Sequence, residues 1–245
     1  MKLFPVAAAA SLVVFSSCST SRGPSRPSGS SPNDEWGHRS GPRGFSTVII
    51  DAGHGGHDPG AVSRFTGQKE KDLALDVARR VKSKIGGKVR AVMMRNSDVF
   101  IDLDDRVDAA NRYRDAILVS IHFNSGPGHV RGPETYYWRV DSHGLAVRCQ
   151  RAMLGISPAE SANRGMVRRR LRLTRNPDMP CLLLELGYLS QRQEASLAAN
   201  ASYREKMADA IADAILDQHR AGDAGTGALP APRWEPPSRP TDSKE

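Results

Sequence analysis

Four ionisable side chains stand where predicted strands end or a predicted helix begins. His54 follows one predicted strand inside a glycine-rich segment, and His122 follows another strand. Glu185 ends a late strand, and Glu70 opens a helix directly after the glycine-rich segment. Ligand sites in sheets of parallel strands form at the carboxyl ends of the strands. We therefore expect these two histidines and two glutamates to converge at one edge of the sheet.

This set of side chains suits hydrolysis of an amide. Two imidazoles and one carboxylate are a common ligand set for catalytic zinc, in which a water molecule takes the fourth position. Zinc lowers the pKa of such a water from 15.7 to about 7 and polarises a carbonyl oxygen. A second glutamate that does not bind the metal can then take the proton of the water and deliver it to the leaving amine.

Each of these residues also has a structural interpretation. His54 alone is more simply a structural histidine, and His57, three residues later, is a competing ligand that we expect to be a loop residue. Glu70 alone is a carboxylate at a helix start, where the helix dipole favours it. Glu185 is the hardest to interpret structurally, because it interrupts an apolar run and a buried carboxylate is costly without a partner.

The elements that would position these side chains alternate between strand and helix. Apolar residues recur every fourth position through the segment 70–85, which is typical of a helix. Asp102 can cap the start of a short helix. We predict strands at 47–51, 89–94, 116–121, 135–140 and 181–185, and helices at 70–85, after Asp102, at 145–154 and around 207–215. This alternation predicts an α/β fold with a largely parallel sheet.

Composition excludes several other classes of protein. The 245 residues are 39% hydrophobic and 25% charged, which suits a globular protein. The formal net charge of +8 favours acidic partners such as nucleic acid, anionic lipid or a carboxylate-rich polymer, but no nucleic-acid-binding motif is present. Three cysteines without a CxxC pair exclude zinc sites built on cysteine. The glycine-rich segment matches neither phosphate-binding pattern, GxxxxGK[ST] or GxGxxG.

The two ends of the chain differ in composition from its centre. Residues 1–18 have the form of an export signal, in which an apolar stretch precedes a small residue and Cys18. Cys18 is the expected site of lipid attachment in a lipoprotein, and ordinary secretion with nearby cleavage is the alternative. We predict a flexible linker at 19–44, a folded domain at 45–220 and a disordered tail at 221–245.

Five ordered motifs resemble the zinc-dependent N-acetylmuramoyl-L-alanine amidases of bacterial cell walls, the type 3 amidases. The motifs are segments 50–61, 70–73, 95–111, 120–124 and 180–190. Together they cover nearly all of the predicted folded domain. Ala52, Phe123 and Tyr188 stand where the family usually has Pro, Ala and Phe, and none of these departures removes an expected ligand.

The resemblance implies roles for individual residues. His54, Glu70 and His122 would bind one zinc ion, and Glu185 would be the general acid and base. The substrate would be peptidoglycan, cut between the lactyl group of N-acetylmuramic acid and L-alanine. The implied fold is a single domain with a twisted, mostly parallel sheet flanked by helices on both faces. We expect an exported monomer, held at the membrane through Cys18 and facing the periplasm, that binds no nucleic acid.

Two other functions remain open at this point. One is a non-catalytic peptidoglycan-binding or activator lipoprotein that keeps the fold, although it would be expected to lose a ligand or the catalytic glutamate. The other is a zinc peptidase that cuts within the peptide. The released products separate these functions, because only the amidase gives a free lactyl group and new L-alanine amino termini.

An arginine-rich run and two cysteines leave further alternatives. The run comprises Arg164, Arg168, Arg169, Arg170, Arg172 and Arg175. It is either a solvated face or a set of groups of which some bind carboxylates of the stem peptide. For Cys149 and Cys181 we favour two separate buried thiols over a disulfide, because Cys181 lies in an apolar strand.

Overall fold

The computed structural model describes residues 40–159 and 161–230. The predicted signal segment and lipid site, nearly all of the predicted linker and most of the predicted tail therefore lie outside the described residues. The described residues form one sheet of six strands in the order β2-β1-β3-β6-β4-β5, with helices packed against it. None of the described helices combines the length and the hydrophobicity of a membrane-spanning segment.

The sheet is mostly parallel, as predicted. Its strands are β1 (Thr47–Ala52), β2 (Arg90–Met93), β3 (Ala116–Asn124), β4 (Glu134–Tyr137), β5 (Gly165–Arg168) and β6 (Cys181–Tyr188). The first three and β6 run parallel, whereas β4 is antiparallel to β6 and parallel to β5. Because β2 and β3 lie on opposite sides of β1, the strand order reverses at β1 and β3. Ligands of such sheets bind beyond the carboxyl ends of the strands at this reversal.

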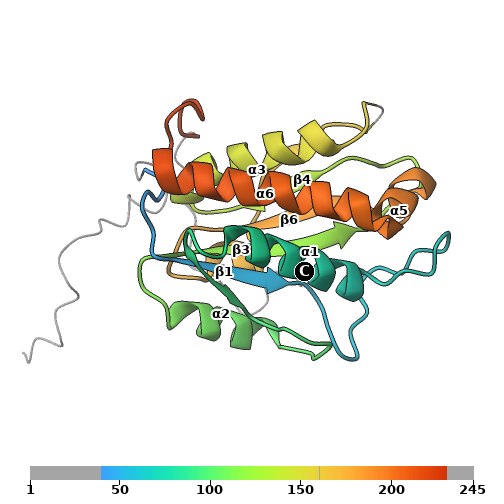
Figure 1. Cartoon of the computed structure of the whole chain (residues 1–245). Helices are drawn as coiled ribbons and strands as arrows, with labels where there is room; N and C mark the ends of the chain where they lie inside the picture. The colour runs from blue at the N-terminus through green and yellow to red at the C-terminus, as the bar shows by residue number, and fades with distance from the viewer. Residues whose placement is uncertain (1–39, 160, 231–245) are drawn as a thin grey trace, which may run out of the picture. The chain divides into compact units, whose positions relative to one another are not determined.

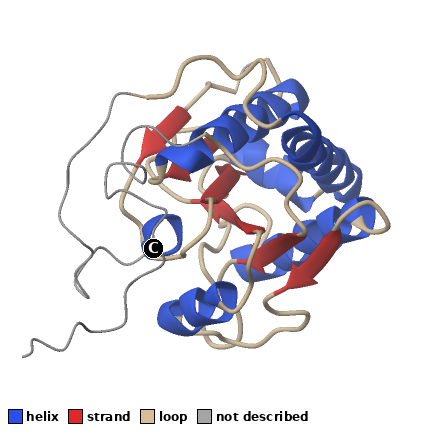
Figure 2. Ribbon diagram, turned by 90° about the vertical axis from the view of Figure 1, so that its left-hand side faces the viewer, coloured by secondary structure: helices blue, strands red, loops and turns tan. Residues whose placement is uncertain are grey.

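Helices cover both faces of the sheet. They are α1 (Glu70–Ile85), α2 (Leu103–Asn111), the 3-10 turn η2 (Val140–Ser142), α3 (His143–Ile156), α4 (Arg172–Arg175), α5 (Arg192–Ala199) and α6 (Ala201–Ala221). The main core packs α1, α3 and α6 on one face, and a smaller core packs α2 and α4 on the other. Figure 1 shows α2 on the opposite side of the sheet from α3 and α6, and Figure 2 shows the strands between helices.

The alternation of side chains along β3 explains its apolar sequence. Ile117, Val119 and Ile121 belong to the main core, and Leu118 belongs to the smaller core on the other face. A strand that is buried on both faces is apolar throughout, not only at every second residue. By the same alternation, His122 stands on the face of Leu118, towards α2 and α4.

Several predicted elements have the expected limits and others do not. Helix α1 has the predicted bounds, and the Asp102 side chain caps α2 by accepting from the backbone N–H of Asp104. Strand β3 continues past its predicted end to Asn124, so His122 lies within the strand. Elements β5, α4, α5 and η2 were not predicted. Their segments have only three to eight residues, so no apolar period marks them.

The first and last described residues pack together at one end of α6. The Gly41 N–H donates to Asp223 over 2.6 Å, and the Gly44 N–H donates to the carbonyl of His219 over 2.8 Å. Cys149 and Cys181 are both free and buried, as expected. Burial raises the pKa of both thiols, so they remain protonated near neutral pH.

Candidate metal centre and active site

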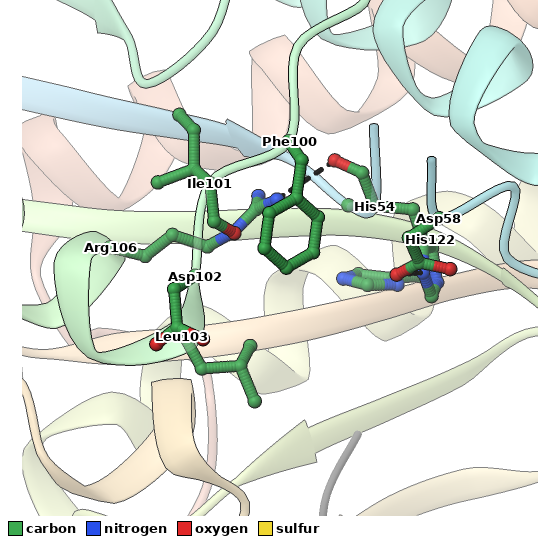
Figure 3. Close-up of a pocket in the computed structure, with 9 residues that line it drawn as sticks. His54, Asp58, Phe100, Ile101, Asp102, Leu103, Arg106 and His122 are labelled. Carbon is green, nitrogen blue, oxygen red and sulfur yellow. Dashed lines mark hydrogen bonds and ion pairs between the residues drawn. The ribbon is translucent and has the colours of Figure 1, made fainter. Parts of the chain in front are cut away.

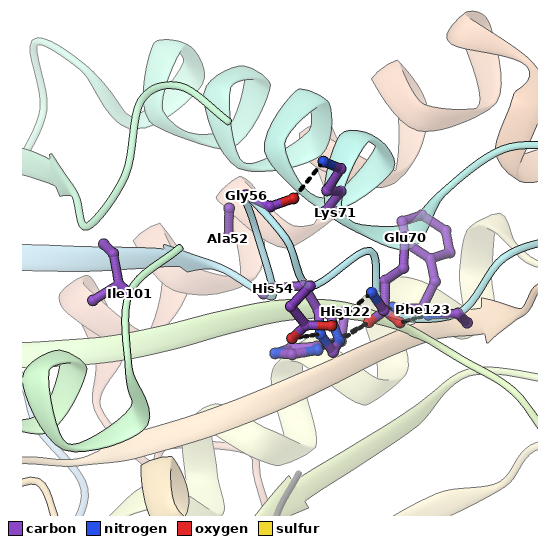
Figure 4. A network of polar contacts seen from close by, with 12 residues as sticks. Ala52, His54, Gly56, Glu70, Lys71, Ile101, His122 and Phe123 are labelled. Carbon is purple, nitrogen blue, oxygen red and sulfur yellow. Dashed lines mark hydrogen bonds and ion pairs between the residues drawn. The ribbon is translucent and has the colours of Figure 1, made fainter. Parts of the chain in front are cut away.

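His54, Glu70 and His122 come together at the carboxyl edge of the sheet. One ligand atom from each lies within 4.8 Å of the others. The Glu70 Oε1 atom is 3.0 Å from His54 Nε2 and 2.9 Å from His122 Nδ1. Figure 4 shows both imidazoles directed towards the Glu70 carboxylate. These three side chains could hold a metal ion.

Each side chain reaches the group from a different element. His122 lies in β3, Glu70 is the first residue of α1, and His54 lies in the turn after β1. His54 has a φ of 58°, which is a left-handed backbone conformation that few residues other than glycine adopt. Such a conformation costs about 1–3 kcal/mol and persists only where surrounding contacts hold it.

Two glycines leave the space that the group occupies. A Cβ atom at Gly53 would lie 2.2 Å from the His122 ring. A Cβ atom at Gly60 would lie 2.6 Å from both Glu70 Oε2 and the His54 ring, and Gly60 also has a φ of +62°. These positions therefore need glycine because of close approach, and the glycine-rich sequence before α1 follows from the geometry of the site.

The second nitrogen of each histidine is held by a neighbouring polar group. His54 Nδ1 is 2.7 Å from Asp58 Oδ2, and His122 Nε2 is 3.1 Å from Ser120 Oγ. Metal-binding histidines almost always use their other ring nitrogen in this way, which fixes the ring and its tautomer. The donor set and its supporting contacts thus fit a site for a divalent metal.

The carboxylate of Glu70 is fixed through both oxygens. Oε1 accepts from the Phe123 N–H over 3.0 Å, and Oε2 accepts from the Ala61 N–H over 2.8 Å. Burial raises the pKa of Glu70, but its contacts with the two histidines outweigh burial and lower it overall. Burial lowers the pKa of His54, but hydrogen bonds to Glu70 and Asp58 outweigh burial and raise it to about 9.

Two buried arginines hold the loop that carries His54. Arg106 pairs with the buried Asp51 and donates to the carbonyls of Ala52 and His54 over 2.9 and 2.8 Å. Arg95 donates to the carbonyl of Ala52 over 2.8 Å and to that of Gly53 over 2.7 Å. These bonds satisfy the backbone of the turn and restrain the left-handed residue.

Glu185 lies next to the group of three. It stands opposite His122 in the register of the parallel strands β3 and β6. It lines a pocket of about 290 Å³ together with His54, Glu70 and His122. Arg169 lines the same pocket, which we call the Arg169 pocket.

A buried carboxylate and two tyrosines stand on the other side of Glu185. Glu134 is opposite Glu185 in the antiparallel pair of β4 and β6. Its carboxylate accepts from the Tyr136 hydroxyl over 2.8 Å and from the Tyr188 hydroxyl over 3.2 Å. Burial and the negative charge of Glu134 raise the pKa of Tyr136, and they raise the pKa of Tyr188 to about 12. Both tyrosines therefore stay protonated and donate.

A second pocket, of about 250 Å³, opens on the other side of the two histidines. Phe100, Ile101 and Leu103 line it, and we call it the Phe100 pocket (Figure 3). His57 stacks on Phe100 with ring centroids 4.2 Å apart and is not a member of the metal-binding group. The expectation that His57 is a loop residue is thus confirmed.

The four residues singled out from the sequence lie together, but their supporting residues were missed. Asp58, Ser120 and Glu134 were not assigned roles from the sequence. Asp58 stands four residues after His54 and Ser120 two residues before His122, so proximity to a candidate ligand was the available signal. Glu134 gave no such signal, because only the pairing of β4 with β6 brings it to the site.

Comparisons with known proteins identify the family. The model of the N-acetylmuramoyl-L-alanine amidase family matches residues 48–217. The Bacillus subtilis uncharacterized protein YqiI is 36% identical over 174 residues, which are 69% of this chain and 82% of that protein. Among solved structures, the N-acetylmuramoyl-L-alanine amidase AmiC2 of Nostoc punctiforme is 37% identical to this chain, with a TM-score of 0.66. An N-acetylmuramoyl-L-alanine amidase of Clostridium difficile 630 is 31% identical, with a TM-score of 0.67. Each of these two comparisons covers 71% of this chain and 97% of the solved chain. The chain therefore belongs to the N-acetylmuramoyl-L-alanine amidase family.

Proposed function

We propose that this protein is a zinc-dependent peptidoglycan amidase that cuts between the lactyl group of N-acetylmuramic acid and L-alanine. Membership of the family supports the amidase activity. The observation that supports the metal mechanism is the convergence of His54, Glu70 and His122 in one pocket with Glu185.

In this proposal His54, Glu70 and His122 hold one zinc ion. Two imidazole nitrogens and one carboxylate oxygen are donors that zinc accepts, and they leave a coordination position open. A bound zinc ion would supply Lewis-acid chemistry, since it polarises a carbonyl oxygen and makes water acidic enough to react near neutral pH. Asp58 and Ser120 keep the two imidazole rings in the orientation that this requires.

Glu185 is the proton carrier in the proposed reaction. It takes a proton from the attacking water and delivers it to the nitrogen of L-alanine as the C–N bond breaks, so the peptide leaves as an amine. Its place beside His122, in the pocket that the three other side chains line, supports this role. Because Glu185 belongs to β6, a central strand, the sheet and not a loop positions the Glu185 carboxylate.

The identity of the bond cut is tested by the products. Purified sacculi are digested with the purified full chain, with and without a chelator, and the products are identified by mass spectrometry. The proposal predicts free lactyl groups and new L-alanine amino termini that disappear when chelator is present. Cleavage inside the peptide would instead identify a peptidase, and binding without cleavage would identify a non-catalytic binding protein.

We further propose that the protein is an exported lipoprotein of the cell envelope. An amidase of this family needs access to peptidoglycan, which agrees with an export signal at 1–18 and lipid attachment at Cys18. Within segment 19–44, the residues before Gly41 would act as the tether, because Gly41 and Gly44 are hydrogen-bonded to Asp223 and His219. Metabolic labelling with a fatty acid tests the anchor, and label that persists in the Cys18→Ala protein would contradict it.

A further inference from the structure

The metal-binding group lies between two pockets of different character. His54 and His122 line both the Phe100 pocket and the Arg169 pocket. A substrate whose amide bond sits at these histidines would extend in two directions, with the sugar on one side and the peptide on the other. The charges of the two pockets decide which direction suits an acidic peptide.

The Phe100 pocket offers poor binding for a carboxylate. Each pocket is lined by two carboxylates, Asp58 and Asp102 here and Glu70 and Glu185 in the Arg169 pocket, so the pockets differ in the state of their arginine. Its one arginine, Arg106, is buried and is already engaged by Asp51 and by the carbonyl oxygens of the His54 loop. The remaining surface is largely aromatic and aliphatic, and it suits the apolar face of a sugar ring better than an anion.

The Arg169 pocket offers a guanidinium group. The backbone of Arg169 is fixed, because its N–H donates to the Tyr137 carbonyl over 2.9 Å and its own carbonyl accepts from the Thr174 hydroxyl over 2.7 Å. Its guanidinium lies over the Tyr136 ring, 5.7 Å from the centroid. The Tyr136 ring is itself held by its bond to Glu134. The side chain is exposed, and in residues 40–159 and 161–230 it forms no ion pair.

Other members of the arginine run have structural partners. Arg164 approaches Glu134 at 4.0 Å, and Arg172 pairs with Asp104 on α2 at 3.3 Å. Arg168 donates to the Trp138 carbonyl over 2.8 Å. Arg169 is the member of the run that lines the pocket beside Glu185.

We propose that Arg169 binds a carboxylate of the stem peptide, namely the free α-carboxylate of the residue that follows L-alanine. The peptide then occupies the Arg169 pocket and the muramoyl sugar occupies the Phe100 pocket. A planar guanidinium forms two parallel hydrogen bonds with a carboxylate, which a carboxamide cannot reproduce. The enzyme would therefore prefer a free α-carboxylate over its amide. This inference rests on the proposed amidase function and adds a substrate preference to it.

The test uses two synthetic N-acetylmuramoyl-L-alanyl-γ-D-glutamyl peptides, one with a free α-carboxylate and one with an α-carboxamide. The purified full chain should cleave the carboxylate substrate with a kcat/KM about ten- to a hundredfold higher than the amide substrate. In Arg169→Gln that preference should vanish, mainly through a higher KM for the carboxylate substrate. Arg169→Lys should retain part of the preference, because it keeps the charge but not the planar fork.

The matched control is Arg151→Gln, which removes the same charge from an exposed residue of α3, on the other face of the sheet. It should leave the preference intact. Equal cleavage of both substrates by the wild-type chain would overturn the inference and leave the amidase function standing. An equal loss of activity on both substrates in Arg169→Gln, or the same effect in Arg151→Gln, would also overturn it. Cleavage of neither substrate by the wild-type chain would reject the amidase function and this inference with it.

Discussion

His122 and Glu185 occupy opposite positions in the register of the neighbouring parallel strands β3 and β6. Side chains at paired positions point to the same face of a sheet, and adjacent strands lie about 4.8 Å apart. The separation between the proposed ligand and the proposed proton carrier is therefore set by strand pairing in the centre of the sheet. Both belong to elements that are buried on two faces, so a change in a surface loop would leave their relation intact.

Replacing His122 should remove metal from the protein. His122→Ala deletes one of three donors, so metal content per chain, measured by atomic emission after dialysis, should fall well below one. The matched control is His57→Ala, because His57 stacks on Phe100 and lies outside the group. If the His57 variant lost metal and the His122 variant kept it, His57 and not His122 would be the metal ligand.

Asp58 should act on metal affinity through His54. Asp58→Ala removes the group that holds His54 Nδ1, and loss of such a partner weakens metal binding about 10–100-fold. Competition with a chromogenic chelator measures this change. The matched control is Asp108→Ala, which removes an exposed carboxylate from α2. An unchanged affinity in Asp58→Ala would mean that the His54 ring is held by its other contacts.

A comparison of Gly60 with Gly67 separates two reasons for glycine, namely the lack of space for a Cβ atom and the positive φ of the backbone. Gly60 and Gly67 both have positive φ values, of +62° and +71°, but only at Gly60 would a Cβ atom meet Glu70 and His54. Gly67→Ala should cost about 1 kcal/mol of unfolding free energy and keep metal binding. Gly60→Ala should cost more and also weaken metal binding. Urea unfolding and metal titration of both variants test this, and equal effects would show that only backbone strain matters.

An ion-pair network between α1 and α6 should make stability depend on pH. Burial raises the pKa of Asp76, but hydrogen bonds from Arg80 and Arg204 outweigh burial and lower it overall. A folded-state pKa below the unfolded value of about 3.9 stabilises the fold above that pH, and this contribution disappears as the pH falls through the folded pKa.

The Asp76→Asn protein should therefore be about 0.5–1 kcal/mol less stable than the wild type at pH 7, and the difference should shrink as the pH falls from about 5 to 3. Chemical denaturation at several pH values measures the difference. Asp213→Asn is the control, because Asp213 is exposed on α6 and forms no ion pair among the residues that the structure describes. A difference that grows towards low pH would mean that the Asp76 carboxylate does not stabilise the fold in its charged form.

The regular elements could be predicted from the sequence because local patterns encode them. Helix α1 has an apolar residue every fourth position, and β3 and β6 are continuous apolar runs. Strand β5 and helix α4 could not be predicted in this way. They lie in the arginine-rich run, where arginines stack on aromatic rings such as Tyr136 and Trp138 that are distant in sequence.

The candidate site was predicted in its main members and not in its details. The motifs that resemble the family identified the two histidines and two glutamates together. The role of Asp58 depends on the left-handed turn at His54, a conformation that residues other than glycine adopt only uncommonly. The place of Glu134 depends on the antiparallel pairing of β4 with β6, which is a property of the whole sheet.

The central claim is that Glu185 carries the proton in a metal-dependent amide hydrolysis, and Glu185→Gln tests it most directly. The glutamine keeps the size of the side chain but cannot accept and return a proton. Zinc content and kcat on sacculi are measured together for the variant and the wild type. The account predicts equal zinc content and a kcat reduced by about 10²–10⁴-fold. A variant that holds zinc and retains the wild-type kcat would contradict it.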